Sequence, residues 1–308
     1  MGSTGKFVLL SAIWGSSFAL IEVAVDAGVP PVQVALARCL FGALALGAIC
    51  VAQRAAVPRD PRTWGHAAVV AALLNSVPFT LLAFGESRVD SVLAGVLNAT
   101  TPLTTLAFAL LVVPGEQVTR TRLAGLLLGF CGVLVLLGVW RGLDGDVLAG
   151  GLACLGATTC YGAGFAYTRR FLSGVPHRAS ALSAVQITCA TAQLGLAAPV
   201  LSGPPSWPGA SAALALLALG AVGTGYAYVL NLDLIREAGP TVAATVTYVT
   251  PLWSTALGYF LLAEPVGWHT LAGGGVVVGA VLLARRPVRD RSGTSPVPGR
   301  RPGARAGD

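Results

Sequence analysis

Long apolar runs separated by short charged breaks dominate this sequence and constrain its fold more than any other feature. A helix needs ~20 residues to cross the hydrocarbon core of a bilayer. Ten runs of about this length can be traced, over residues 7–25, 32–52, 66–84, 91–113, 122–139, 147–168, 179–201, 209–232, 240–262 and 268–284. The runs lack the period-2 alternation of a transmembrane β-barrel, and lipid requires backbone hydrogen bonds within each segment. The sequence therefore predicts an all-α membrane protein with ten transmembrane helices.

The composition agrees with this class. Charged residues make up 11% of the 308 residues, against roughly 25% in soluble domains. The six cysteines all lie in apolar runs without CxxC or Cys/His spacing, so neither a disulfide framework nor a zinc site is expected. The first run, after Lys6, continues without a small-x-small cleavage pattern. We expect it to be a retained helix rather than a signal peptide.

The basic residues are distributed unevenly between the two sides of the predicted membrane domain. With the N-terminus in the cytoplasm, seventeen of the twenty Lys and Arg residues fall on the cytoplasmic side. Two, Arg88 and Arg141, fall outside, and Arg38 lies within a span. Because basic loops are retained in the cytoplasm, we expect a plasma-membrane protein with both termini cytoplasmic. The basic segment 286–308 is expected to be a disordered anchor, and the net charge of +7 does not require nucleic acid.

Short sequence matches recur in the same order at nearly one spacing. The segment Trp14–Phe18 resembles Tyr161–Phe165, and Thr101-Pro102-Leu103 recurs as Thr250-Pro251-Leu252. Further matches join Glu116 to Glu264 and Leu123-Ala-Gly to Leu271-Ala-Gly. The predicted halves are therefore 1–142 and 143–285. Five spans are an odd number, so the second half is expected to be inverted, as in many secondary transporters.

These motifs also resemble a known family. The residues Trp14-Gly-Ser-Ser-Phe18, Arg38, Thr101-Pro102-Leu103 and Leu123-Ala-Gly-Leu-Leu-Leu-Gly129 are similar to an EamA-type repeat. The second half repeats the pattern from Tyr161 to Gly279, except that no Arg lies near position 185. The resemblance to the drug/metabolite transporter superfamily implies ten helices around a central cavity. It also implies transport of small metabolites, commonly the export of amino acids or related compounds.

Charged residues inside spans are candidates for function because they are costly in lipid. Glu22 and Arg38 are the clearest, and no other acidic residue is expected well inside a span. One interpretation is an ion pair that joins the first two helices. The other is that Arg38 binds a carboxylate or phosphate of the substrate, since its planar fork suits either anion.

Uncharged polar and aromatic residues complete the predicted substrate pathway. With the two charged residues, the predicted set is Trp14, Ser17, Glu22, Arg38, Asn75, Asn98, Tyr161, Gln186, Tyr226 and Tyr248. Each uncharged member has an alternative role as an interhelical hydrogen-bonding group or interface anchor. Pro102 and Pro251 free backbone carbonyls at matching places and are predicted hinges. Glu116 and Glu264 are interpreted as helix-end residues.

These observations favour one function over several alternatives. The sequence predicts a secondary transporter that exports a small metabolite by alternating access. The alternative is a non-transporting membrane scaffold or a lipid flippase of the same fold. An intramembrane enzyme would need a paired nucleophile and base or clustered His, Asp and Glu at membrane depth, which the spans do not offer. The sequence contains no GxxxxGK[ST] motif, so an ATP-driven pump is not expected. We expect a small-molecule substrate and a lipid bilayer as partners, no nucleic acid, no cofactor or metal, and a monomer or homodimer.

Overall fold

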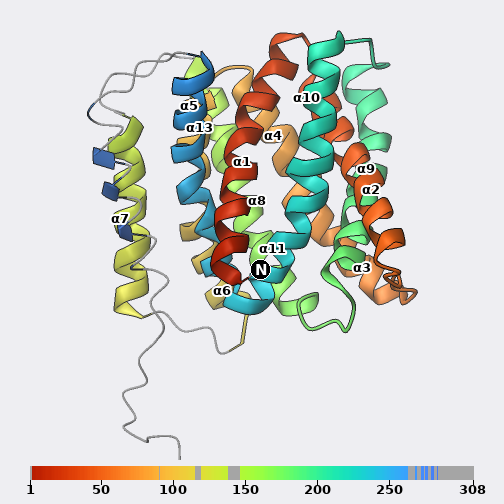
Figure 1. The fold of residues 1–308 in the computed structure, drawn as a ribbon, viewed down its shortest axis with the longest axis horizontal. Helices are drawn as coiled ribbons and strands as arrows, with labels where there is room; N and C mark the ends of the chain where they lie inside the picture. Colours follow the sequence, from red (N-terminus) through yellow and green to blue (C-terminus); the bar gives the residue numbers. More distant parts are fainter. Residues whose placement is uncertain are drawn as a thin grey trace, which may run out of the picture.

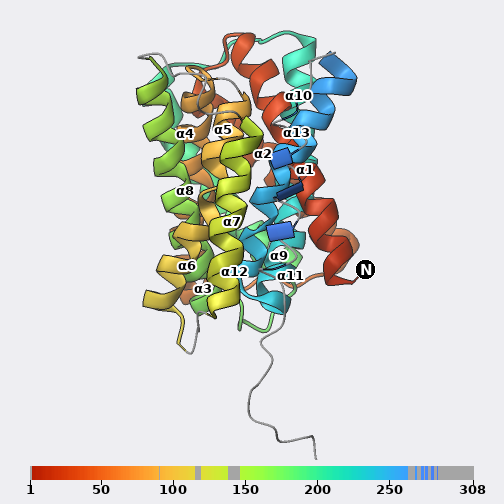
Figure 2. The same ribbon diagram turned by 90° about the vertical axis from the view of Figure 1, so that its left-hand side faces the viewer.

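The protein is a bundle of helices in a computed structural model that describes residues 2–89, 91–114, 119–137 and 146–262, with single positions between 268 and 283. The first half contributes α1 (Ser3–Asp26), α2 (Pro31–Ala52), α3 (Pro61–Ala71), η1 (Ala72–Ser76), α4 (Val77–Glu86), α5 (Ser91–Asn98), α6 (Thr101–Val112) and α7 (Arg120–Leu137). The second half contributes α8 (Asp146–Phe171), α9 (Ala179–Ser202), α10 (Ala210–Gly220), η3 (Ala221–Tyr226), α11 (Ala227–Ala238), α12 (Pro240–Ala244) and α13 (Val246–Leu262). Most helices run roughly parallel to one axis, and helices of the two halves alternate around the bundle (Figures 1 and 2).

Six helical segments are long and apolar enough to cross a membrane: Ser3–Asp26, Pro31–Ala52, Pro61–Glu86, Leu148–Phe171, Ala179–Ser202 and Ala210–Ala238. Shorter apolar helices cover Thr101–Val112 and Leu123–Gly132. Each predicted span between 7 and 262 coincides with a helix or with consecutive helices, whereas the tenth, 268–284, falls mostly outside the described residues. The described residues form no β-strand. Large apolar side chains such as Leu111 and Val200 are 82% and 84% exposed, which suits contact with lipid rather than water.

The first two helices are joined by a turn that the sequence dictates. α1 is followed by Gly28 at φ 80°, a left-handed conformation that glycine adopts without steric cost. Pro30 and Pro31 follow, and Pro31 is the first residue of α2, where a missing amide hydrogen is harmless. This tight connection places Glu22 and Arg38 near the same end of the bundle, opposite the end at which α1 begins (Figure 1). We refer to the two ends as the N-terminal end and the opposite end.

The third apolar segment of each half contains a π-helical turn. In the first half η1 lies between α3 and α4, and in the second half η3 lies between α10 and α11. They begin at Ala72 and Ala221, which agrees with the spacing of the sequence matches. A π turn inserts an extra residue into a helix and is frequent at functional sites.

Two glycines of the repeated motif make reciprocal contacts between the halves. Gly15 on α1 packs against α13, where an added Cβ would lie 2.8 Å from the carbonyl oxygen of Thr250. Gly162 on α8 packs against α6, where an added Cβ would lie 2.7 Å from the carbonyl carbon of Thr104. Each half therefore uses its first helix to contact the fourth apolar segment of the other half.

The fourth apolar segment of each half is interrupted. Ala99 and Thr100 separate α5 from α6, and Thr245 separates α12 from α13. Pro102 lies in the first turn of α6, whereas Pro251 lies inside α13. The two prolines thus occupy matching sequence positions but different places in their helices. Glu116 and Glu264 lie outside the described residues.

Candidate functional site

A cavity lies at the centre of the bundle and is formed by both halves. Its lining is mostly apolar and aromatic, with a few polar side chains, and comprises Trp14, Ser17, Phe18, Ile21, Arg38, Leu74, Phe79, Leu82, Asn98, Tyr161, Phe165, Tyr228, Asn231 and Thr247. The space open to the centre of a water molecule is about 50 Å³. A single water needs roughly 10–15 Å³ on this scale. The cavity therefore has room for a few waters, and a metabolite would require its walls to move apart.

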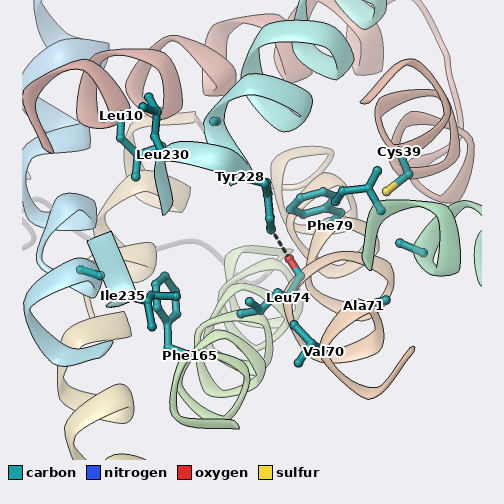
Figure 3. Packing of buried hydrophobic residues seen from close by; sticks show 14 of the residues in the cluster. Leu10, Cys39, Val70, Ala71, Leu74, Phe79, Phe165, Tyr228, Leu230 and Ile235 are labelled. Atoms are coloured by element: carbon teal, nitrogen blue, oxygen red, sulfur yellow. Dashed lines mark hydrogen bonds between the residues drawn. The ribbon is translucent and has the colours of Figure 1, made fainter. Parts of the chain in front are cut away.

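Three aromatic rings from different helices form one wall of this cavity. The rings of Trp14 and Tyr228 meet edge to face with centroids 6.1 Å apart. Tyr228 meets Phe79 in the same manner at 6.3 Å, an arrangement that aromatic pairs prefer. The Tyr228 hydroxyl donates a 2.7 Å hydrogen bond to the carbonyl oxygen of Leu74 (Figure 3). That carbonyl belongs to η1, so the π turn of the first half holds the tyrosine of the second.

Arg38 supplies the positive charge of the cavity. Its side chain is 5% exposed, and its guanidinium carbon lies 3.7 Å from the centroid of the Phe79 ring, a favourable cation–π distance. Its Nε donates to the Thr224 hydroxyl at 2.8 Å, and Nη2 lies 3.5 Å from the carbonyl oxygen of Gly223. Both partners are neutral and belong to η3. A guanidinium group has five N–H donors, and these two contacts involve only two of them. The other N–H groups can bind an anion.

Two other lining residues present buried polar atoms that lack a partner in the described part of the chain. Trp14 Nε1, a donor, and Asn231 Oδ1, an acceptor, make no hydrogen bond with any described residue. Buried polar atoms without partners are unfavourable, and those at a cavity are natural points of contact for a ligand or water. The cavity therefore offers a cation, a donor and an acceptor within aromatic walls.

Five of the predicted pathway residues line the cavity: Trp14, Ser17, Arg38, Asn98 and Tyr161. Glu22 does not, and it is only partly buried near the end of α1. The ion pair between Glu22 and Arg38 is not formed, because neither residue has an oppositely charged partner within 4.0 Å among the described residues. Arg38 instead turns to Thr224 and Phe79.

Four predicted residues lie elsewhere. Asn75 accepts a 2.7 Å hydrogen bond from Gln186 in a buried contact between η1 and α9. Tyr248 is fully buried, donates to the carbonyl oxygen of Leu126 at 2.8 Å and packs against Gly129. Tyr226 is 40% exposed on the outside of the bundle. These four residues do not line the cavity in this conformation.

The predicted pathway set omitted four aromatic lining residues: Phe18, Phe79, Phe165 and Tyr228. Tyr228 lies two residues after Tyr226, and such residues point about 200° apart around a helix. The extra residue of η3 changes which positions of this segment face the cavity. Because the sequence did not reveal η3, the cavity-facing positions after it could not be predicted. Phe79 and Phe165 lie in runs so rich in apolar residues that no face was distinguishable.

Sequence reasoning also missed an acidic residue. The predicted third span ended at 84, but α4 continues to Glu86. Both carboxyl oxygens of Glu86 are buried and make no hydrogen bond within the described protein. Nearby ionisable groups include Arg38, Glu22 and Cys154. Glu86 lies with these groups toward the opposite end of the bundle. The expectation that no further acidic residue lies within a span was wrong.

Polar contacts join the two halves at the N-terminal end. Lys6 Nζ lies 2.8 Å from a carboxylate oxygen of Asp233 and 2.6 Å from one of Glu237. Arg236 donates to the carbonyl oxygens of Ser173, Val175 and His177 at 3.0–3.1 Å. These contacts tie α1 and the α8–α9 connection to the end of α11, at the end of the bundle where the chain begins (Figure 1).

Comparisons with known proteins agree with these features. A sequence model described as the EamA-like transporter family matches residues 5–138 and again residues 148–286. The uncharacterized inner membrane transporter YedA of Escherichia coli is 29% identical over 285 residues, which cover 91% of this chain and 89% of that protein. The aromatic amino acid exporter YddG of Ancylobacter novellus is 31% identical over 201 residues, or 63% of this chain and 68% of that protein. One crystal structure has a TM-score of 0.74 at 23% identity, covering 92% of this chain and 96% of that chain; it indicates a shared fold.

Proposed function

This chain belongs to the EamA-like transporter family, and we propose that it exports small amino-acid-like metabolites from the cell by alternating access. It is a multi-pass membrane transporter. The proposal adds a substrate class, a direction and a mechanism. The observation that carries it is Arg38, a buried cation without a carboxylate partner in an aromatic cavity. A transporter for neutral lipophilic compounds would gain nothing from that charge, which is costly at this depth.

The lining suggests which amino acids fit. The Arg38 guanidinium would bind the substrate carboxylate, and its planar fork accepts both oxygens. The rings of Trp14, Phe79 and Tyr228 would pack against an apolar or aromatic side chain, which adds burial and edge-to-face contacts. YddG is named as an aromatic amino acid exporter, and this relative supports the same class here. Phenylalanine and tryptophan are the first substrates to test.

Alternating access is supported by the arrangement of the two halves. The cavity lies between them, the π turns recur at matching positions, and Gly15 and Gly162 make reciprocal contacts. We propose that residues 1–142 and 143–285 form inverted five-helix halves, giving ten helices with both termini cytoplasmic. The contracted cavity and the Lys6 contacts fit a conformation closed at the N-terminal end. Widening the cavity would then require the halves to move relative to each other.

The test is export of labelled substrate by purified protein in liposomes. We expect the reconstituted protein to release preloaded L-[³H]phenylalanine and L-[³H]tryptophan. Arg38→Gln should lower the rate about tenfold or more, since a charge-assisted hydrogen bond contributes ~1.5–3 kcal/mol. Arg88→Gln is the matched control, because Arg88 is exposed at the same end and lies over the Phe84 ring.

Two results would contradict the proposal. Equal rates for Arg38→Gln and the wild type would remove Arg38 from the pathway. Intact, folded protein that moves neither amino acid would favour the scaffold or flippase alternative. A fluorescent phospholipid in the same liposomes separates these two, because only a flippase transfers it between leaflets.

A further inference from the structure

Glu86 is a carboxyl group in an environment that does not suit a carboxylate. Both of its oxygens are buried, and neither has a hydrogen-bond partner among the described residues. An ionised carboxylate in this setting is strongly unfavourable, because it loses its hydration without replacement. A protonated carboxyl tolerates burial much better.

The groups that face Glu86 come from the helices packed around α4. They are Arg38 on α2, Glu22 on α1, and Cys154 and Tyr161 on α8. Arg38, the positive charge that acts on Glu86, forms no ion pair with it within 4.0 Å and instead contacts Thr224 and Phe79. The described residues of η1 and α5 carry no ionisable side chain. Asp90, after α4, lies outside the described residues.

α4 packs closely on α8 next to this carboxyl group. An added Cβ at Gly85 would overlap Cys154 Sγ, and an added Cβ at Gly150 would lie 3.2 Å from the carbonyl oxygen of Gly85. Cys154 itself is 0% exposed. Gly85, which makes this contact, directly precedes Glu86 in α4. Separation of α4 from α8 would therefore open the surroundings of the carboxyl group and of the Cys154 thiol together.

We infer that Glu86 is a proton-binding site that couples opening of the α4–α8 contact to proton release. In the closed conformation the carboxyl group holds a proton. When α4 and α8 separate, the carboxyl becomes hydrated and releases that proton to the adjoining aqueous phase. Closing the contact again requires a proton to be taken up from that phase. The inference deepens the proposed function and rests on its alternating access, because it makes one gating step depend on protons.

Linkage gives the sign and size of the effect. If only the hydrated open state ionises, opening becomes up to about tenfold more favourable for each pH unit above the range in which that state titrates. Protonation below that range removes the advantage. Glu86→Gln mimics the protonated form at every pH, so its opening should not depend on pH.

Cys154 is a native reporter of this opening. Purified protein in liposomes is treated with N-ethylmaleimide between pH 5 and 7, and mass spectrometry measures alkylation at Cys154 relative to the exposed Cys131. Dividing the wild-type rate by the Glu86→Gln rate at each pH removes the pH dependence that the two thiols share. An ionised Glu86 beside Cys154 disfavours the reactive thiolate, so it slows alkylation in the wild type and acts against the expected rise. This quotient should rise from pH 5 to pH 7 by more than about tenfold, within the limit set by linkage.

The controls isolate Glu86. Glu22→Gln should leave the pH response intact, because Glu22 is partly exposed at the same end. Glu86→Asp should retain a pH response, which a purely structural role of the longer side chain would not. A quotient that stays constant with pH overturns the inference. A rising quotient in protein that transports neither phenylalanine nor tryptophan supports the proton site, while the proposed substrate class fails.

Discussion

Tyr226 and Tyr228 lie two residues apart in one apolar segment, where η3 meets α11, yet their side chains have different surroundings. Tyr228 is 4% exposed, contacts Trp14 and Phe79, and is held by the Leu74 carbonyl. Tyr226 is 40% exposed. The same substitution can therefore be compared at a cavity-lining tyrosine and at an exposed one.

We predict that Tyr228→Ala lowers phenylalanine export while Tyr226→Ala does not. Loss of the aromatic contacts, at ~0.5–1.5 kcal/mol each beyond burial, corresponds to a decrease of about tenfold. Export from proteoliposomes, normalised to folded protein by gel filtration, measures the effect. Tyr228→Phe should retain most of the activity, because it keeps the ring and removes only the bond to Leu74. A larger loss from Tyr226→Ala than from Tyr228→Ala would disprove the cavity wall described above.

At the residue scale, the sequence identified the charged residue Arg38 within a span but not the residues that it contacts. Arg38 stood out because a charge within an apolar run needs no structure to be noticed. Its partners could not be predicted, since Thr224 lies 186 positions away and only folding joins them. Glu86 was overlooked because it ends an apolar run and was assigned to the following loop. The helix in fact continues through it, and both of its carboxyl oxygens are buried.

At the element scale, glycines set the distance between helices that carry site residues. Gly220 lies where α10 meets α2, and an added Cβ would lie 2.9 Å from the carbonyl oxygen of Arg38 and 3.2 Å from the Gly42 nitrogen. Both atoms are backbone, so the contact cannot be relieved by a side-chain rotation. Gly220 is also the last residue before η3, which holds Thr224 against Arg38.

We predict that Gly220→Ala destabilises the protein by about 1–3 kcal/mol, the usual cost of overpacking. The measurement is thermal unfolding of purified protein in detergent, in which the midpoint should fall. Gly47→Ala on α2 is the matched control, because no atom lies within 4 Å of its added Cβ. That change should be neutral or raise the midpoint, since alanine favours helix by about 1 kcal/mol over glycine. Equal midpoints for the two variants would refute the close contact.

Also at this scale, the interruptions within helices were only partly predictable. Pro102 and Pro251 marked the fourth segment of each half, and both segments are indeed divided. In the second half, however, the break lies at Thr245 and Pro251 remains inside α13, because a helix can continue through a proline when neighbouring groups satisfy the freed carbonyl. The π turns η1 and η3 left no recognisable pattern in the sequence, since they arise from packing between segments.

At the scale of the whole molecule, the repeat connects the sequence to the cavity. Matches between the halves were visible in short motifs such as Trp14–Phe18 and Tyr161–Phe165. In the structure, Trp14 and Tyr161 are both lining residues and come from corresponding first helices. The same motif positions thus contribute to one site from two sides. The cavity's small size and its closing contacts could not be predicted, because they describe one conformation rather than the fold.

The proposed orientation follows from the charge distribution and can be tested on the whole chain. Lys6, Arg169, Arg178 and Arg236 gather at the N-terminal end of the bundle, where the chain begins (Figure 1). Because basic segments are retained in the cytoplasm, we predict that this end is cytoplasmic. The connection at 202–208, between α9 and α10, lies at the opposite end and should be outside.

Reporter fusions distinguish the two orientations. A green fluorescent protein fused after residue 308 should be fluorescent, whereas alkaline phosphatase fused there should be inactive. Alkaline phosphatase placed in 202–208 should be active, because that enzyme requires the oxidising side of the membrane. A fusion in the connection at 53–60, between α2 and α3, is the internal control and should behave like the C-terminal one. If the 202–208 and C-terminal fusions report the same side, the proposed inverted arrangement fails. Three predicted spans, 209–232, 240–262 and 268–284, separate the two sites, and an odd number of crossings places them on opposite sides of the membrane.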